Sequence, residues 1–176
     1  RYAALSDWAA ERNIPLLLTA HHADDQAETL LMRLQRGSGI AGLAGVRAAR
    51  RERNLTVVRP LLGWTRAELA EIVSSAGIEP MDDPSNRDPR FDRTHARRLL
   101  TTADWLDPER LVATASNCAD ADQALEWAAS REFAGRHRRD GDAVLLDPRG
   151  LPHELRRRVV LGAFKLLAAP GPAGPQ

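Results

Sequence analysis

Two hydrophobic patterns follow each other directly near the start of the chain. Residues 16–20 form an apolar run without alternation, Leu-Leu-Leu-Thr-Ala, which is typical of a strand buried on both faces of a parallel sheet. From Ala23 onward the apolar positions recur with helical spacing and predict one packing stripe. The stripe consists of apolar side chains at i, i+3, i+4 and i+7: Ala27, Leu30, Leu31 and Leu34. A buried strand that leads into an amphipathic helix is therefore the predicted centre of the fold.

The opposite face of this helix is polar and begins with acidic residues. At about 100° per residue it carries the side chains of Asp25, Glu28, Thr29, Arg33 and Arg36. An ordinary surface helix is polar there too. This face, however, begins where a buried strand ends, and ligands of open α/β sheets bind at that edge. His21, Asp25 and Glu28, at i, i+4 and i+7, are therefore candidates for one side of a binding cleft.

The patterns on either side extend the α/β arrangement. Residues 2–12 are predicted to form a helix and residues 56–59 a second short strand. Thr65 and Glu68 have the spacing of a capping box, which predicts a helix that Gly77 closes. Helices that alternate with strands in this way indicate the α/β fold class with a parallel sheet.

A glycine-rich segment and a basic segment lie between these elements. Residues 37–45 contain four glycines in nine positions. Because they follow a helix rather than a strand, a helix C-cap and loop is favoured over a phosphate-binding loop. Residues 47–54 form a basic hairpin or loop, for which a solvated charged surface is favoured over a nucleic-acid contact.

Residues 87–98 carry a row of arginines. If this segment is helical from about Pro89, Arg90, Arg93 and Arg97 share one face. Guanidinium groups in such a row suit a phosphate or a carboxylate, because each can form two hydrogen bonds to either. An ion-paired helix has the same pattern, so both interpretations stay open.

The remainder is predicted as a helix over 101–134, a strand within 141–148, a helix over 151–167 and a disordered Pro/Gly-rich tail from residue 170.

The composition excludes several classes of protein. The formal net charge of +1 does not by itself indicate a nucleic-acid-binding protein. The single cysteine, Cys118, excludes an intrachain disulfide framework and a Cys-x-x-Cys site. No apolar run reaches the length of a membrane helix and no signal peptide is evident, so we expect a cytoplasmic protein without a membrane partner.

The acidic strand end allows several chemistries. Its carboxylates can bind Mg²⁺ or the ammonium group of a substrate, and His21 can contact a phosphate or orient a nucleophile. A metal hydrolase would use His21, His22, Asp24 and Asp25, but no second histidine cluster supplies the remaining ligands. From the residues alone, the prediction is a nucleotide or anion site on an α/β sheet, and the reaction stays open.

Several motifs, in their order and spacing, resemble the tRNA(Ile)-lysidine synthase family. They are residues 19–29 (Thr-Ala-His-His-Ala-Asp-Asp-Gln-Ala-Glu-Thr), 36–39 (Arg-Gly-Ser-Gly), 42–45 (Gly-Leu-Ala-Gly), 59–62 (Arg-Pro-Leu-Leu), and 83–86 (Asp-Pro-Ser-Asn) followed by Arg93. The resemblance covers about residues 1–100. It implies an N-type ATP pyrophosphatase (PP-loop) fold, so that residues 1–103 are the C-terminal part of a Rossmann-like parallel-sheet catalytic domain. Residues 104–176 would then be a helical connector and the start of a C-terminal domain.

The resemblance also implies a reaction. Enzymes of this family use ATP, with Mg²⁺, to adenylate C2 of the wobble cytidine in an isoleucine tRNA with a CAU anticodon. The ε-amine of L-lysine then displaces AMP, and pyrophosphate is the other product. The expected partners are therefore this tRNA, L-lysine and ATP, and a homodimer is an open alternative to a monomer.

The family's residue roles transfer to matching positions. Asp25 and Glu28 would hold the lysine ammonium and His21 would lie beside the nucleotide. Arg93 would stabilise a phosphate or the adenylate, and Arg1 matches an arginine expected near the nucleotide. The implied catalytic residues are thus His21, Asp25, Glu28 and Arg93, with no residue assigned to a metal.

Two departures from the family pattern qualify these roles. The family's Ser-Gly-Gly-x-Asp-Ser loop is absent from the sequence and is expected upstream of Arg1, so we expect residues 1–176 alone to be inactive. The usual Arg-Asn-Arg-x-Arg run is Arg-Thr-His-Ala-Arg over residues 93–97. The alternatives are another PP-loop tRNA-modifying enzyme, a His/Asp metal-dependent hydrolase and a non-catalytic RNA-binding module. Of the first group, the tRNA thiolases are disfavoured because they commonly carry paired cysteines.

Overall fold

The chain divides into two compact units, Arg1–Ala119 and Asp120–Gln176. The computed structural model describes residues 2–81, 90 and 92–168 of the 176. Within the described residues, no helix combines the length and the apolar character that crossing a membrane requires.

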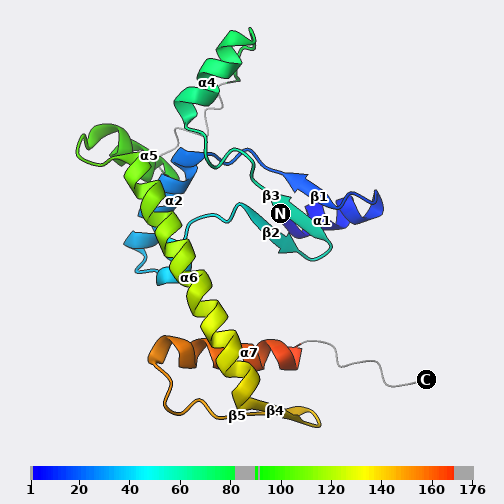
Figure 1. The fold of residues 1–176 in the computed structure, drawn as a ribbon. Coiled ribbons are helices and arrows are strands. Elements are labelled where there is room, and N and C mark those ends of the chain that lie inside the picture. Colours follow the sequence, from blue (N-terminus) through cyan, green and yellow to red (C-terminus); the bar gives the residue numbers. More distant parts are fainter. Residues whose placement is uncertain (1, 82–89, 91, 169–176) are drawn as a thin grey trace. The chain divides into compact units, whose positions relative to one another are not determined.

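A three-stranded sheet lies in the first unit (Figure 1). Its order is β1 (Leu16–Leu18), β3 (Leu55–Val58) and β2 (Ala49–Glu52). Strand β1 runs parallel to β3, with Leu17 opposite Val57, and β2 pairs with β3 as an antiparallel hairpin. The predicted α/β class with a parallel strand pair is confirmed, as is the hairpin interpretation of the basic segment.

The burial predicted for the first strand is wrong. Leu55 and Val57 of β3 are buried, whereas Leu16 and Leu18 of β1 are 47% and 60% exposed. Among the described residues, β1 has a strand partner on one side, β3, and its apolar side chains are not covered as those of β3 are. An apolar run without alternation indicates a strand, but it does not show which neighbours cover that strand.

Helices α1 (Tyr2–Glu11), α2 (Ala23–Gln35) and α3 (Ile40–Leu43) belong to the same unit. On α2 the predicted packing stripe is confirmed at Ala27 and Leu30, which are buried, but Leu34 is 50% exposed. Glu28, predicted to lie on the polar face, is buried instead. That face is covered because α5 (Asp92–Thr102) packs against α2.

The glycine-rich segment after α2 is a helix end and a loop, as predicted. Gly37 has a positive φ of 65°, and its N–H donates to the Leu34 carbonyl at 3.0 Å, which closes the helix. Gln26 of α2 then forms two hydrogen bonds to the backbone of Val46, at 2.6 and 2.7 Å. Gly45 lies so close to Gln26 that an added Cβ would be 2.5 Å from its side-chain oxygen. The segment is thus fixed to the helix that precedes it.

Helix α4 (Arg66–Ser75) begins with the predicted capping box. The N–H of Glu68 donates to Thr65 Oγ1 at 3.2 Å, and the N–H of Thr65 donates to Glu68 Oε2 at 2.7 Å. The arginine-rich segment is helical as α5 from Asp92. Residues 82–89, with the Asp-Pro-Ser-Asn motif, lie outside the described residues.

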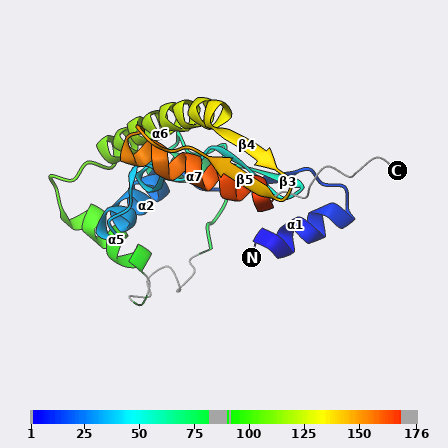
Figure 2. The same cartoon turned by 90° about the horizontal axis from the view of Figure 1, so that it is seen from below.

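The second unit contains the C-terminal part of α6 (Pro108–Arg136), the hairpin β4 (His137–Asp140) and β5 (Ala143–Leu146), and α7 (His153–Ala168) (Figure 2). Within the segment predicted as helical over 101–134, α5 ends at Thr102 and α6 begins at Pro108, where the Asp107 side chain accepts the N–H of Glu109 at 2.8 Å. Strand β4 was not predicted, since its sequence His-Arg-Arg-Asp is polar. The apolar core of the unit is formed by Ala129, Leu151 and Val159.

Candidate functional site

A cavity of about 440 Å³ lies beside the C-terminal end of β1. It brings together three of the predicted site residues, His21, Asp25 and Arg93. Its other lining residues come from α1, β1 and the turn after β1: Tyr2, Leu5, Leu17, Thr19 and Ala20. A cavity at the carboxyl end of a parallel strand is the place at which α/β sheets bind ligands.

His21 is held by a hydrogen bond within the same turn. Its Nδ1 lies 3.0 Å from Oγ1 of Thr19. Burial lowers the pKa of His21 from 6.5; Asp25 opposes this shift, and Arg59 and Arg93 add to it. The imidazole is therefore neutral at neutral pH, and Nε2 is the ring nitrogen that Thr19 leaves unused.

Asp25 uses both carboxylate oxygens. Oδ2 accepts the backbone N–H of His22 at 3.0 Å, which caps the first turn of α2. Oδ1 accepts from Nη2 of Arg93 at 2.9 Å. The acid that starts α2 thus also fixes an arginine of α5 at the cavity.

Glu28 does not line the cavity. Its side chain is 2% exposed and accepts from two arginines of α5. Nε of Arg93 donates to Oε2 at 2.7 Å, and Nε of Arg97 donates to Oε1 at 2.8 Å. The hydrogen bond to Glu28 raises the pKa of Arg97 against the effect of burial. Arg97 was not among the residues that the resemblance implied, but it belongs to the arginine row predicted to suit a phosphate or a carboxylate, and its partner here is the carboxylate of Glu28.

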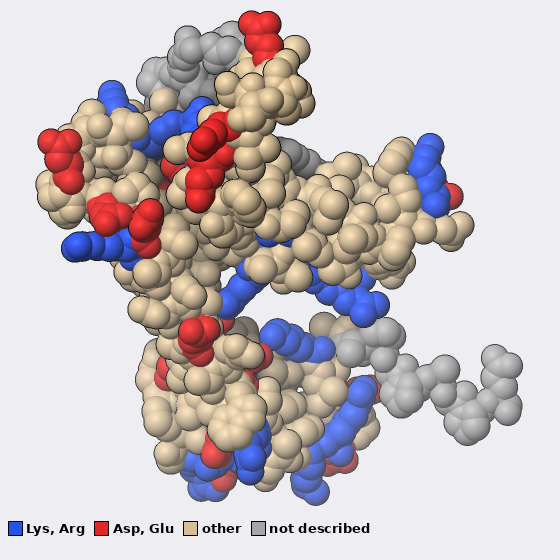
Figure 3. All heavy atoms as spheres, turned by 45° about the horizontal axis from the view of Figure 1, so that its top comes forward, with Lys and Arg blue, Asp and Glu red and all other residues tan. Residues whose placement is uncertain are grey.

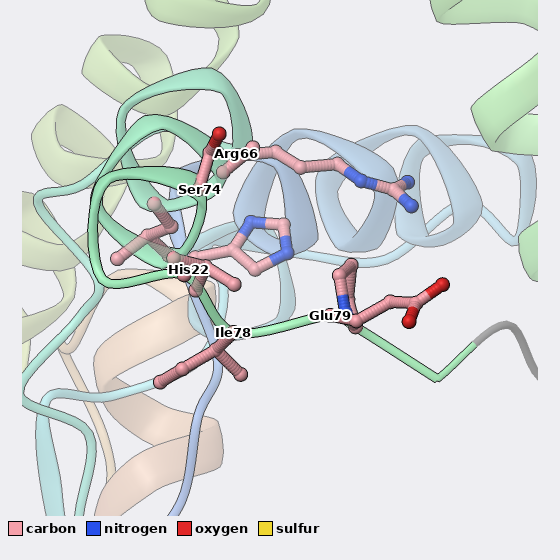
Figure 4. Close-up of a pocket in the computed structure, with 10 residues that line it drawn as sticks. His22, Arg66, Ser74, Ile78 and Glu79 are labelled. Atoms are coloured by element: carbon pink, nitrogen blue, oxygen red, sulfur yellow. The ribbon is translucent and has the colours of Figure 1, made fainter.

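The adjacent histidine faces a different pocket. His22 is the N-cap residue of α2 and has an extended backbone (φ −125°, ψ −177°), with its Nε2 3.7 Å from Oδ2 of Asp25. Together with α4 and residues 77–80 it lines a pocket of about 630 Å³. Figure 4 shows its imidazole between the walls of this pocket, with Arg66 and Glu79 at the rim. The two imidazoles therefore do not converge on one ion.

The described residues contain no group of three or more His, Cys, Asp or Glu side chains arranged to hold a metal ion. Asp25 and Glu28, the acids nearest the cavity, already accept from arginines and from the backbone. Asp24, a further hydrolase candidate, caps α4 by accepting the backbone N–H of Arg66 at 2.7 Å. These residues do not fit a resident Mg²⁺ site, and we derive no step through one.

Arg1, a predicted site residue, lies outside the described residues, as does the Asp-Pro-Ser-Asn motif of the resemblance. Tyr2 and Thr19 line the cavity without having been assigned a role from the sequence. On the face shown in Figure 3, basic and acidic side chains are both present over the surface. This mixture agrees with the formal net charge of +1.

Comparison with known proteins decides the family. Residues 1–103 match the PP-loop domain family. The chain belongs to the PP-loop family. A PP-loop domain is an ATP-binding domain, so this assignment confirms the fold that the motifs implied and supports ATP as a ligand.

Curated relatives have the name of the family that the motifs resemble. The tRNA(Ile)-lysidine synthase of Zymomonas mobilis is 47% identical over 171 residues, which cover 95% of this chain and 52% of that protein. The tRNA(Ile)-lysidine synthase of Novosphingobium aromaticivorans is 43% identical over 178 residues, covering 99% of this chain and 55% of the relative. That of Ruegeria pomeroyi is 44% identical over 166 residues. The chain spans about half the length of the first two relatives.

Proposed function

We propose that the full-length protein is a tRNA(Ile)-lysidine synthase. In the first step, the C2 oxygen of the wobble cytidine attacks the α-phosphorus of ATP, a new P–O bond forms and pyrophosphate leaves. In the second step, the ε-ammonium of L-lysine loses a proton to water, and the resulting amine attacks C2. The C–N bond forms, the C–O bond breaks and AMP leaves. The substrate is an isoleucine tRNA with a CAU anticodon.

The observation that carries this proposal is the shared cavity of His21, Asp25 and Arg93. The reaction needs a negative group for the lysine ammonium and a positive group for the phosphate, close to each other. Asp25 and Arg93 supply this pair, and their contact of 2.9 Å places both at one end of β1. A neutral imidazole beside them can hydrogen-bond a nucleotide without adding charge.

We assign the residues at and near the cavity the following roles in this reaction. Asp25 holds the lysine ammonium, with Glu28 as the second carboxylate expected from the resemblance. Arg93 stabilises negative charge that develops on the phosphate, which a fixed guanidinium does without reorganisation. His21 and Arg1 lie beside the nucleotide. Mg²⁺ enters as the companion of the ATP phosphates, and a homodimer and a cytoplasmic location stay predictions.

The proposal is tested by lysine incorporation. The full open reading frame is expressed, and the purified protein is incubated with a CAU isoleucine tRNA transcript, labelled L-lysine, ATP and Mg²⁺. Labelled lysine in the anticodon, dependent on ATP, is the expected result. A transcript whose anticodon begins with uridine is the control. If no lysine is incorporated while tRNA-dependent AMP release occurs, the protein is another PP-loop tRNA-modifying enzyme.

A further inference from the structure

Glu28 has a different geometry from Asp25, although both acids belong to the same helix face. Asp25 lines the cavity, whereas Glu28 is almost completely buried behind it. Both oxygens of Glu28 accept from guanidinium groups, one from Arg93 and the other from Arg97. A ligand in the cavity therefore meets Asp25 and Arg93 before it can reach Glu28.

The two arginines are neighbours on α5, one helical turn apart, and both are cations. Like charges at this spacing repel each other and destabilise the arrangement. A carboxylate placed between them attracts both guanidinium groups, which offsets their mutual repulsion. It also gives each guanidinium a fixed hydrogen-bond partner. Glu28 is placed in this way, because each of its oxygens accepts from the Nε of one arginine.

Each guanidinium keeps donors for a ligand. A guanidinium has five N–H groups. Among the contacts of the described residues, Arg93 uses Nε and Nη2, and Arg97 uses Nε. Nη1 of Arg93 and both terminal nitrogens of Arg97 therefore remain for an anion with several oxygens. The side chains are 42% and 29% exposed, so both can be reached from solvent.

We propose that Glu28 is a positioning residue, and that it holds Arg93 and Arg97 as a rigid pair that binds a phosphate group of the reactants. Arg97, which lies outside the lining of the cavity, becomes a phosphate-binding residue beside Arg93 through their shared partner Glu28. This replaces the direct lysine contact that the resemblance implies for Glu28: Glu28 acts on lysine only indirectly, and Asp25 is the carboxylate that meets the ammonium. This inference rests on the proposed function, since it assigns residues to the adenylation step of that reaction.

The test separates the two steps in the full-length enzyme. Adenylation is measured without lysine, as transfer of label from [α-³²P]ATP to tRNA, and the KM for lysine is measured in the complete reaction. The variants are Glu28→Gln, Arg97→Gln and, as the matched control, Arg98→Gln. Arg98 is the next residue on α5, is exposed and contacts His95 rather than Glu28.

We expect Glu28→Gln and Arg97→Gln to slow adenylation by at least about tenfold, with the KM for lysine unchanged within about twofold. Glutamine offers one acceptor and turns its NH₂ group toward the second arginine, so one guanidinium loses its partner. Arg98→Gln keeps the normal rate. A raised KM for ATP assigns the bound phosphate to the nucleotide, and a raised KM for tRNA assigns it to the RNA backbone.

The inference is contradicted if the variants affect lysine binding and leave adenylation unchanged. If Glu28→Gln raises the KM for lysine about tenfold and leaves adenylation intact, Glu28 contacts the ammonium itself. If Glu28→Gln does not fold, as judged by circular dichroism, Arg97→Gln and Arg97→Lys decide the matter, and normal adenylation in both removes Arg97 from the site. A wild-type protein that adenylates tRNA but does not incorporate lysine would refute the proposed function while the adenylation rates still decide this inference.

Discussion

Arg93 and Asp25 are 68 positions apart in the sequence, yet Nη2 of Arg93 donates a hydrogen bond of 2.9 Å to Oδ1 of Asp25. The contact joins the first turn of α2 to the first turn of α5 at the edge of one cavity. The carboxylate proposed to receive the lysine ammonium thus already has a cationic neighbour. An incoming ammonium and this guanidinium share the charge of one carboxylate, so lysine binding and phosphate binding are coupled at Asp25.

Asp25→Asn should weaken lysine binding in the full-length enzyme. A hydrogen bond to a charged group contributes about 1.5–3 kcal/mol, so the KM for lysine should rise about ten- to a hundredfold. Adenylation should change less than lysine binding, because Arg93 keeps its hydrogen bond to Glu28 when asparagine accepts the His22 N–H. Steady-state lysine incorporation measures the KM. Asp92→Asn, at an exposed acid paired with Arg36, is the control. Loss of adenylation in Asp25→Asn would contradict the assignment.

Arg93→Ala should damage the first step. Removing one fixed donor from developing negative charge costs about 3–4 kcal/mol in comparable sites, so adenylation should fall about a hundredfold or more. Formation of adenylated tRNA without lysine measures this rate. Arg98→Ala removes a neighbouring arginine and should have the normal rate. An unchanged rate in Arg93→Ala would exclude Arg93 from the site.

His21 should make stability depend on pH near neutrality. In the unfolded chain the pKa of His21 is about 6.5, and burial lowers it in the folded protein. At a pH between the folded and the unfolded pKa, the unfolded chain binds the proton and the folded protein does not. The stabilising effect is fully present above about pH 6.5 and is lost as the pH falls below it. Melting temperatures of wild type and His21→Gln, compared from pH 8 to pH 5, measure it. The wild type should lose more stability than the variant on acidification, and equal losses would contradict this assignment.

Arg158 should be important for the stability of the second unit. Its side chain is 6% exposed and donates to Asp122 at 2.6 Å, Glu126 at 3.0 Å and Glu154 at 2.8 Å. Arg158→Met removes the guanidinium on which these carboxylates converge, and breaking a buried ion pair costs about 3 kcal/mol or more. Urea denaturation measures the change. Arg157→Met, at a more exposed arginine that also contacts Glu154, should cost less than about 1 kcal/mol. Equal costs in both variants would show that burial of Arg158 is unimportant.

Local signals allowed much of the fold to be predicted. The strand at Leu16–Leu18, the start of α2 and the capping box at Thr65 depend on residues within a few positions of each other. Steric preferences, helical spacing and caps act over such distances, so the sequence contains them directly. The motif around His21 and Asp25 likewise indicated the sheet edge at which the cavity lies. Strand β4 was missed because its sequence is polar and its residues are mostly exposed, so that only the pairing with β5 identifies it as a strand.

The sequence by itself determined the α/β elements, the PP-loop resemblance and the acids and arginine of the candidate site. Only the tertiary structure decided that Glu28 is buried and accepts from Arg93 and Arg97, which are 65 and 69 positions away. It also decided that Leu16 and Leu18 of β1 are exposed and that the two histidines face different pockets. The physical reason is the distance along the sequence over which each kind of interaction acts. Helical periodicity shows which side chains share a face, but the packing of a distant helix determines what covers that face and which charges meet there.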